Sequence, residues 1–148
     1  MTHATILFSR SRTLGSLLIR SATWSRWSHV CLATPDGTAI EATAAHGVQE
    51  VDVYDVIDRS SMVALGRVWC PDVPAAIAWA RQQVGKPYDF LGVVGLGLHR
   101  DWQQDDNWWC SELVEAALAK GGNLRFRHDL QRVTPQHSWM VTPNGYAT

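Results

Sequence analysis

Several features that define common protein classes are scarce or missing in this 148-residue sequence. There are only three cysteines, at positions 31, 70 and 110, and they form neither a CxxC pair nor a paired Cys/His motif. Structural zinc sites and disulfide frameworks depend on such spacings, so neither is expected here. The lack of a disulfide framework also fits a reducing compartment.

Long apolar runs are missing as well. The longest run, residues 90–98, is interrupted by glycines and is too short to cross a bilayer. The first 35 residues carry four arginines and no acidic residue, but their apolar runs are too short for the core of a signal peptide. The sequence therefore predicts a cytoplasmic or otherwise soluble protein, without a signal peptide or an integral membrane segment.

Charge and composition narrow the range of partners. The net charge is −1, so no overall attraction to nucleic acid or to a membrane surface is expected. The sequence is 46% hydrophobic and 18% charged, as in soluble globular proteins, and it contains no repeat or linker. We expect one domain over residues 1–148. The eight tryptophans could line a substrate groove or pack in the core.

Hydrophobic periodicity and turn residues predict several strands followed by two clear helices. Strands are expected at residues 4–9, 28–33, 38–44, 47–54 and 61–69, with a weaker helix at 13–21. One clear helix follows the capping residue Asp72 and ends near Gly85, and the other begins at Cys110. We expect a loop with a short helix at 90–98, an edge strand at 124–128, and irregular structure from 133 onward. This order indicates an α+β fold with a mostly antiparallel sheet packed against helices.

Cys110 is the candidate nucleophile. It lies where a polar loop, residues 103–107, meets the start of the second helix, which is defined by apolar residues at helical spacing: Leu113, Val114, Ala117 and Leu118. The positive end of the helix dipole favours the thiolate, which is the form that attacks carbonyl groups. From the local sequence alone, a buried structural cysteine is the commoner interpretation.

A cysteine nucleophile needs a base and a residue that orients the base. His29 begins a predicted strand, which can hold an imidazole rigidly, although it could simply pack on the sheet. Glu41, on the returning strand, could accept the second ring N–H of His29. A two-residue turn at 36–37 would pair 29 with 44 and turn Glu41 to the other face, whereas pairing 29 with 41 needs a longer or bulged loop. Thr43 is the alternative orienting residue.

Tyr88 is the last candidate. It follows Gly85-Lys86-Pro87, between the two predicted helices. A phenol near the cysteine could donate a hydrogen bond to the oxyanion of a tetrahedral intermediate, together with the backbone N–H of Cys110. Alternatively, its ring packs on the end of a helix.

These motifs, taken in order, resemble the circularly permuted papain-like families related to the NlpC-type peptidases, and most closely the YaeF/YiiX group. Gly85-Lys86-Pro87-Tyr88 and Trp109-Cys110-Ser111-Glu112-Leu113-Val114 resemble the helix end and nucleophile helix of those families. Ser28-His29-Val30, Ile40-Glu41-Ala42 and Gly47-Val48 resemble the histidine strand and those after it. In the unpermuted order the histidine follows the cysteine, whereas here it precedes it. Trp109 replaces the family's Asp, at a position without a catalytic role.

The resemblance covers roughly residues 5–135 and implies a circularly permuted papain-like fold with four site residues. Cys110 would be the nucleophile, His29 the base, Glu41 the orienting residue and Tyr88 the oxyanion donor. The implied activity is a cysteine hydrolase or acyltransferase that acts through a thioester and needs no metal or organic cofactor. The implied substrates are small peptides, cell-wall peptides or acyl and lipid groups.

Two other classes of function are alternatives to a cysteine hydrolase. A papain-like binding module without turnover would be favoured if His29 lay far from Cys110, beyond about 6 Å. Thiol redox chemistry is disfavoured, because Cys31 and Cys70 do not have the spacing of a resolving cysteine.

Overall fold

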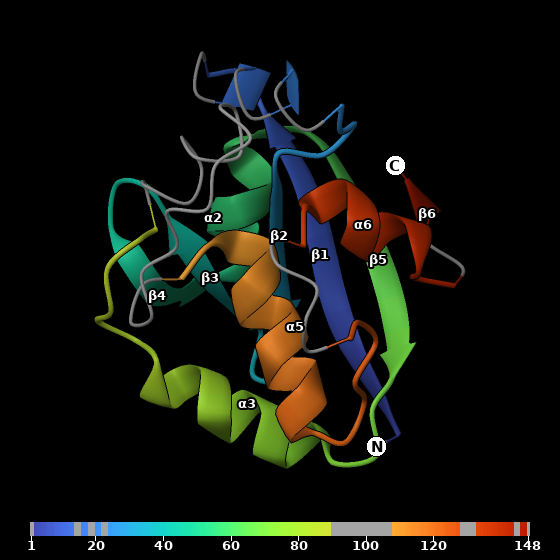
Figure 1. Ribbon diagram of the computed structural model, residues 1–148. Coiled ribbons are helices and arrows are strands. Elements are labelled where there is room, and N and C mark those ends of the chain that lie inside the picture. Colours follow the sequence, from blue (N-terminus) through green and yellow to red (C-terminus); the bar gives the residue numbers. More distant parts are fainter. Residues whose placement is uncertain are drawn as a thin grey trace.

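A six-stranded antiparallel sheet is the framework of the protein (Figure 1). The computed structural model describes residues 2–13, 16–17, 20–21, 24–89, 108–127, 133–143 and 146–147. The strands are β1 (His3–Ser11), β2 (His29–Ala33), β3 (Thr38–Thr43), β4 (Gly47–Asp52), β5 (Ser60–Trp69) and β6 (Tyr146–Ala147), in the order β4-β3-β2-β1-β5-β6. The helices are α2 (Val53–Asp58), α3 (Val73–Gln82), α5 (Cys110–Lys120) and α6 (Pro135–Met140). The expected α+β class is confirmed.

The hairpin between β2 and β3 has a register that the sequence did not predict. Thr34 and Thr38 close a three-residue loop through the bond from Thr34 N–H to Thr38 O, at 2.8 Å. Gly37, the last residue of that loop, has φ +83°, as three-residue hairpin loops require. Leu32 therefore pairs with Ile40, and neither of the two registers considered from the sequence occurs.

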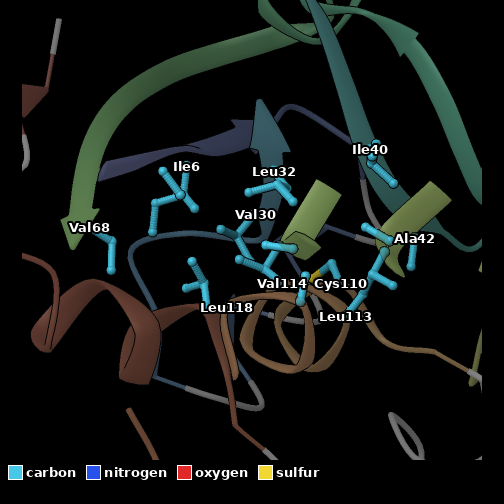
Figure 2. Packing of buried hydrophobic residues seen from close by; sticks show 14 of the residues in the cluster. Ile6, Val30, Leu32, Ile40, Ala42, Val68, Cys110, Leu113, Val114 and Leu118 are labelled. Atoms are coloured by element: carbon cyan, nitrogen blue, oxygen red, sulfur yellow. The ribbon is translucent and has the colours of Figure 1, made fainter. Parts of the chain in front are cut away.

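The two faces of the sheet are covered differently. The larger cluster of buried side chains lies between the sheet, α5 and α3 (Figures 1 and 2). It takes Ile6, Val30, Leu32 and Ile40 from three neighbouring strands and Leu113, Val114 and Leu118 from α5. The opposite face carries a smaller cluster formed by Leu7, Cys31, Ala39 and Val56, the last from α2. This arrangement holds α5 against β2, the strand that carries His29.

Three element predictions are wrong. Val53 and Tyr54 belong to α2 rather than to the preceding strand, because Asp52 caps a helix there by accepting the Tyr54 N–H at 2.8 Å. Residues 124–127 form no strand. Part of the chain beyond 133 is regular, because Thr134 makes a capping box with His137 and starts α6.

Other predictions fall partly or wholly outside the described residues. The segments 90–98 and 103–107 lie outside them, as does residue 128. Of the weaker predicted helix at 13–21, the described residues 16, 17, 20 and 21 are helical. Among the described residues, no helix is long and apolar enough to cross a membrane.

Candidate active site

Cys110 is the first residue of α5. Trp109 before it is extended, with φ −94° and ψ 153°, and makes no side-chain capping bond, so the thiol itself lies at the helix start. The apolar residues predicted for this helix are buried against the sheet, and Figure 2 shows Cys110 in the same cluster as Val30, Leu113 and Val114. Cys110 is itself only 2% exposed. The first-turn N–H groups and the helix dipole favour negative charge at this position.

His29, the first residue of β2, connects Cys110 to Glu41. Its side chain is 16% exposed, and its Nε2 atom lies 2.6 Å from Glu41 Oε2. The Cys110 side chain lies close enough to the ring to raise its pKa. Because Nε2 is occupied by Glu41, the nitrogen available to the cysteine is Nδ1. One imidazole therefore contacts both a thiol and a carboxylate, as a general base and its orienting residue do.

The hairpin register explains how Glu41 reaches His29. Continuing the observed pairing places His29 opposite Thr43, on the same face of the hairpin, and therefore diagonal to Glu41. The Thr43 hydroxyl instead accepts the backbone N–H of His46 at 3.3 Å, within the next turn. Of the two candidate orienting residues, Glu41 is the one that contacts the imidazole.

Glu41 is a fully buried carboxylate with three partners. Besides His29, it accepts bonds from the Arg59 guanidinium, at the end of α2, and from Gln49 Nε2 on β4, at 2.9 Å. Burial alone would raise the pKa of Glu41, but the bonds from His29, Arg59 and Gln49 lower it to about 2. Glu41 is therefore a stable anion behind the imidazole.

The same contacts set the protonation state of His29. Burial lowers the pKa of the imidazole, but the hydrogen bonds to Cys110 and Glu41 and their negative charges outweigh it and raise the pKa from 6.5 to about 9. His29 is therefore largely protonated at neutral pH, beside the Cys110 side chain.

Tyr88 lies in the loop after α3, which is tied to the sheet and to the start of α5. Tyr88 forms a β-bridge with Trp108, and Val48 N–H donates to Lys86 O at 2.9 Å. Burial, followed by the negative charge of Cys110, raises the pKa of the Tyr88 phenol, which therefore remains a hydrogen-bond donor. Tyr88 and His29 share the lining of a cavity of about 360 Å³.

Sequence reasoning missed Arg59 and Gln49. Gln49 pairs directly with Glu41 across β3 and β4, so strand alternation could have placed it on the same face. Arg59 follows a six-residue helix that was not predicted, and no local pattern links it to Glu41.

The described tryptophans that lie near the candidate residues in sequence form no groove beside His29. None of those described lines the cavity beside His29. Trp27 and Trp109 are buried, and Trp108 packs edge-on against Trp79. Trp24 is exposed, whereas Trp102 lies outside the described residues. The other two cysteines, Cys31 and Cys70, are buried free thiols.

Comparisons with known proteins agree with this architecture. Residues 1–142 match the family model described as "permuted papain-like amidase enzyme, YaeF/YiiX, C92 family". The structure resembles the crystal structure of the metalloprotein YiiX from Escherichia coli O157:H7, with a TM-score of 0.69 and 20% sequence identity, over 99% of this chain and 96% of that one. No curated protein matches the chain in sequence. The expected circularly permuted papain-like fold is confirmed.

Proposed function

We propose that this chain, which belongs to the YaeF/YiiX (C92) family of permuted papain-like amidases, is a cysteine hydrolase with a Cys110-His29-Glu41 triad. It would act as one domain, cleaving an amide, peptide or ester bond through a thioester. Family membership supports the hydrolase class. The observation that supports the mechanism is the position of His29, which bonds Glu41 and lies close enough to Cys110 for that side chain to raise its pKa.

In the first half-reaction the Cys110 thiolate attacks the substrate carbonyl carbon and forms a tetrahedral intermediate. His29 then donates its proton to the leaving amine or alcohol as the carbon–leaving-group bond breaks, which leaves a thioester on Cys110. In the second half-reaction His29 takes a proton from water or from another acceptor, which attacks the thioester. Collapse of the second intermediate releases the acid and the Cys110 thiolate, while His29 keeps the proton that it took from the acceptor.

The remaining groups stabilise charge. Glu41 holds the imidazole in place and stabilises its positive form, because its carboxylate stays ionised. The Tyr88 phenol and the Cys110 backbone N–H, at the start of α5, are the proposed donors to the oxyanion.

Two other possibilities have less support. A binding module without turnover would be favoured by a His29 distant from Cys110, whereas the Cys110 side chain lies close enough to the imidazole to raise its pKa. The related YiiX is described as a metalloprotein, but the described residues here include no group of three His, Cys, Asp or Glu side chains that could hold a metal ion. The proposed steps use the chain's own side chains.

Labelling with a panel of thiol-reactive acyl probes tests this proposal. We expect wild-type protein to label at Cys110, Cys110→Ala to lose that label, and His29→Ala to label more slowly by about 10²-fold. Cys70→Ala is the matched control, because it removes a buried thiol at the other end of α5 and should label like wild type. Equal labelling of Cys110→Ala and wild type would refute the proposal.

A further inference from the structure

Trp108 joins the two segments that carry the proposed oxyanion donors. Its backbone N–H donates to Pro87 O at 3.1 Å, and its carbonyl oxygen accepts the N–H of Asp89 at 3.3 Å. These two bonds form the bridge to Tyr88, and Cys110 follows Trp108 by two positions. The position of Trp108 therefore affects both the Tyr88 phenol and the backbone N–H of Cys110.

The side chain of Trp108 is anchored to the end of α3 by Gln83. Its indole Nε1–H donates to Gln83 Oε1 at 3.2 Å, and its ring packs edge-on against Trp79, with 5.3 Å between the ring centroids. The Gln83 side-chain nitrogen donates to Trp79 O, also at 3.2 Å. Both ends of the Gln83 amide are therefore bonded, which fixes the orientation of the amide.

The burial of Gln83 indicates that the bond to Trp108 matters. Gln83 directly follows the last residue of α3 and is only 6% exposed, whereas the neighbouring Gln82 is exposed. Removing an amide from water is costly unless the amide is hydrogen-bonded. Capping of α3 requires only the bond to Trp79 O, so the bond to Trp108 is an additional contact between the helix end and the segment before Cys110.

We propose that Gln83 is a positioning residue for the oxyanion site, because it holds Trp108 at the place where the Tyr88 and Cys110 segments meet. This inference rests on the proposed function, since it concerns the two donors proposed for the oxyanion. Such donors work only when they are aimed at the developing charge, and a misplacement of about 1 Å can cost about 10²-fold in rate. The two side-chain bonds of Gln83 go to tryptophans and not to the triad, so its loss should affect the oxyanion and not the thiol.

Two reagents distinguish the oxyanion site from the thiol of Cys110. p-Nitrophenyl acetate acylates the thiolate through a tetrahedral oxyanion and releases p-nitrophenolate, whereas iodoacetamide alkylates the thiolate with loss of iodide and forms no oxyanion. We expect Gln83→Leu to slow acylation of Cys110 about tenfold and to change its alkylation by less than about twofold. Release of p-nitrophenolate and mass spectrometry of the labelled peptide measure the two rates.

Gln82→Leu is the matched control, because it makes the same substitution one position earlier, where the side chain is exposed. It should leave both rates at their wild-type values. Trp108→Phe keeps an aromatic ring against Trp79 but removes the N–H, so it should slow acylation as Gln83→Leu does. The double variant should be no slower than either single variant, because both remove the same bond. Circular dichroism shows whether each variant is folded, and Trp108→Phe provides the test if Gln83→Leu is not.

Two results would overturn the inference while leaving the hydrolase proposal intact. One is equal slowing of acylation and alkylation, which would make Gln83 a structural residue only. The other is acylation at the wild-type rate in both Gln83→Leu and Trp108→Phe. If wild-type Cys110 were not acylated at all, the hydrolase proposal itself would fail and this inference with it.

Discussion

At the scale of single residues, the protonation of His29 controls the proposed reaction. Because Cys110 and Glu41 raise the pKa of His29 to about 9, the imidazolium needed to protonate the leaving group persists well above neutral pH. We therefore expect kcat/KM on an activated ester to fall only near pH 9. Replacing Glu41 with Gln removes a negative partner, so the alkaline limb should move to lower pH and kcat should fall about 10²-fold.

Glu50→Gln is the control for that pH profile. The pKa of Glu50 is also lowered, by the bond from Arg81, but Glu50 does not contact His29. Glu50→Gln should therefore leave the alkaline limb of the kcat/KM profile at the same pH as in wild type. If the alkaline limb of the wild-type pH profile lay near 6.5, the ordinary pKa of histidine, the charged environment described for His29 would be contradicted.

Arg59 is the second residue with a measurable role, because it compensates the buried charge of Glu41. We expect Arg59→Ala to lower the free energy of unfolding by about 2 kcal/mol, a value reduced from that of a fully buried pair because Arg59 is partly exposed. Arg59→Lys keeps the charge and should lose less. Urea denaturation monitored by tryptophan fluorescence measures both.

Arg81→Ala is the matched comparison for Arg59→Ala. Arg81 forms ion pairs with Asp36 and Glu50 on the surface, so its loss should cost less than about 1 kcal/mol. Equal losses for the two variants would mean that Arg59 acts as an ordinary surface arginine.

The candidate residues differ in how far sequence could identify them. Cys110 and His29 could be named because a helix start and a strand start are local patterns. The Arg59–Glu41 contact could not be named, since it spans 18 residues and depends on where α2 ends. Charge compensation of a buried carboxylate is a property of the folded state, so it leaves no periodic signal.

At the scale of elements, the Tyr88 loop is positioned by its contact with β4. Gly47, at the start of β4, has φ +68°, and a Cβ there would overlap Lys86 O. We expect Gly47→Ala to push the Lys86–Tyr88 loop away from the sheet, to destabilise the fold by more than about 1 kcal/mol, and to lower kcat through Tyr88. Denaturation and kinetics on the same samples measure the two effects.

Gly37→Ala provides the control for Gly47→Ala. Gly37 also has positive φ, at +83°, but a Cβ there would meet nothing within 4 Å. Its substitution therefore reports backbone strain alone and should leave kcat unchanged. If both variants kept full kcat, contact with β4 would not be what holds Tyr88 in place.

Sequence predicted the long elements better than the short ones. β5 and α3 have clear alternation or helical spacing and were placed within one to three residues of their observed bounds. α2 and α6 are six residues each, too short for periodicity, although their caps Asp52 and Thr134 were visible signals. The β2–β3 register depended on a loop one residue longer than the turn signal at Asp36-Gly37 indicated.

At the scale of the whole molecule, the sheet order brings the two ends of the site together. β2 lies beside β1 in the centre of the sheet, and α5 packs across it (Figure 1). His29 therefore lies near Cys110, which comes 81 positions later in the chain. Hydrophobic periodicity predicts the strands but not their order in the sheet. The resemblance to the permuted family predicted that His29 and Cys110 come together, because it relates distant motifs rather than neighbouring residues.

The pH dependence of global stability follows from the same pair of shifted groups. His29, with its pKa raised from 6.5 to about 9, stabilises the fold fully below pH 6.5, and this contribution is lost as the pH rises through 9. Glu41, with its pKa lowered from 4.5 to about 2, contributes fully above pH 4.5, and this contribution is lost as the pH falls toward 2. Their combined stabilisation is therefore greatest between pH 4.5 and 6.5.

Urea unfolding at intervals from about pH 3 to 10 measures this profile, with a His29 contribution on the order of 3 kcal/mol at most. We expect Glu41→Gln to flatten both flanks relative to wild type, because it removes the acidic group itself and one of the two bonds that raise the pKa of His29. Glu50→Gln should keep the alkaline flank, since Glu50 contacts Arg81 and Thr38 but not His29. If Glu41→Gln left the alkaline flank of the stability profile unchanged, the His29–Glu41 pair would not be the source of the pH-dependent stabilisation.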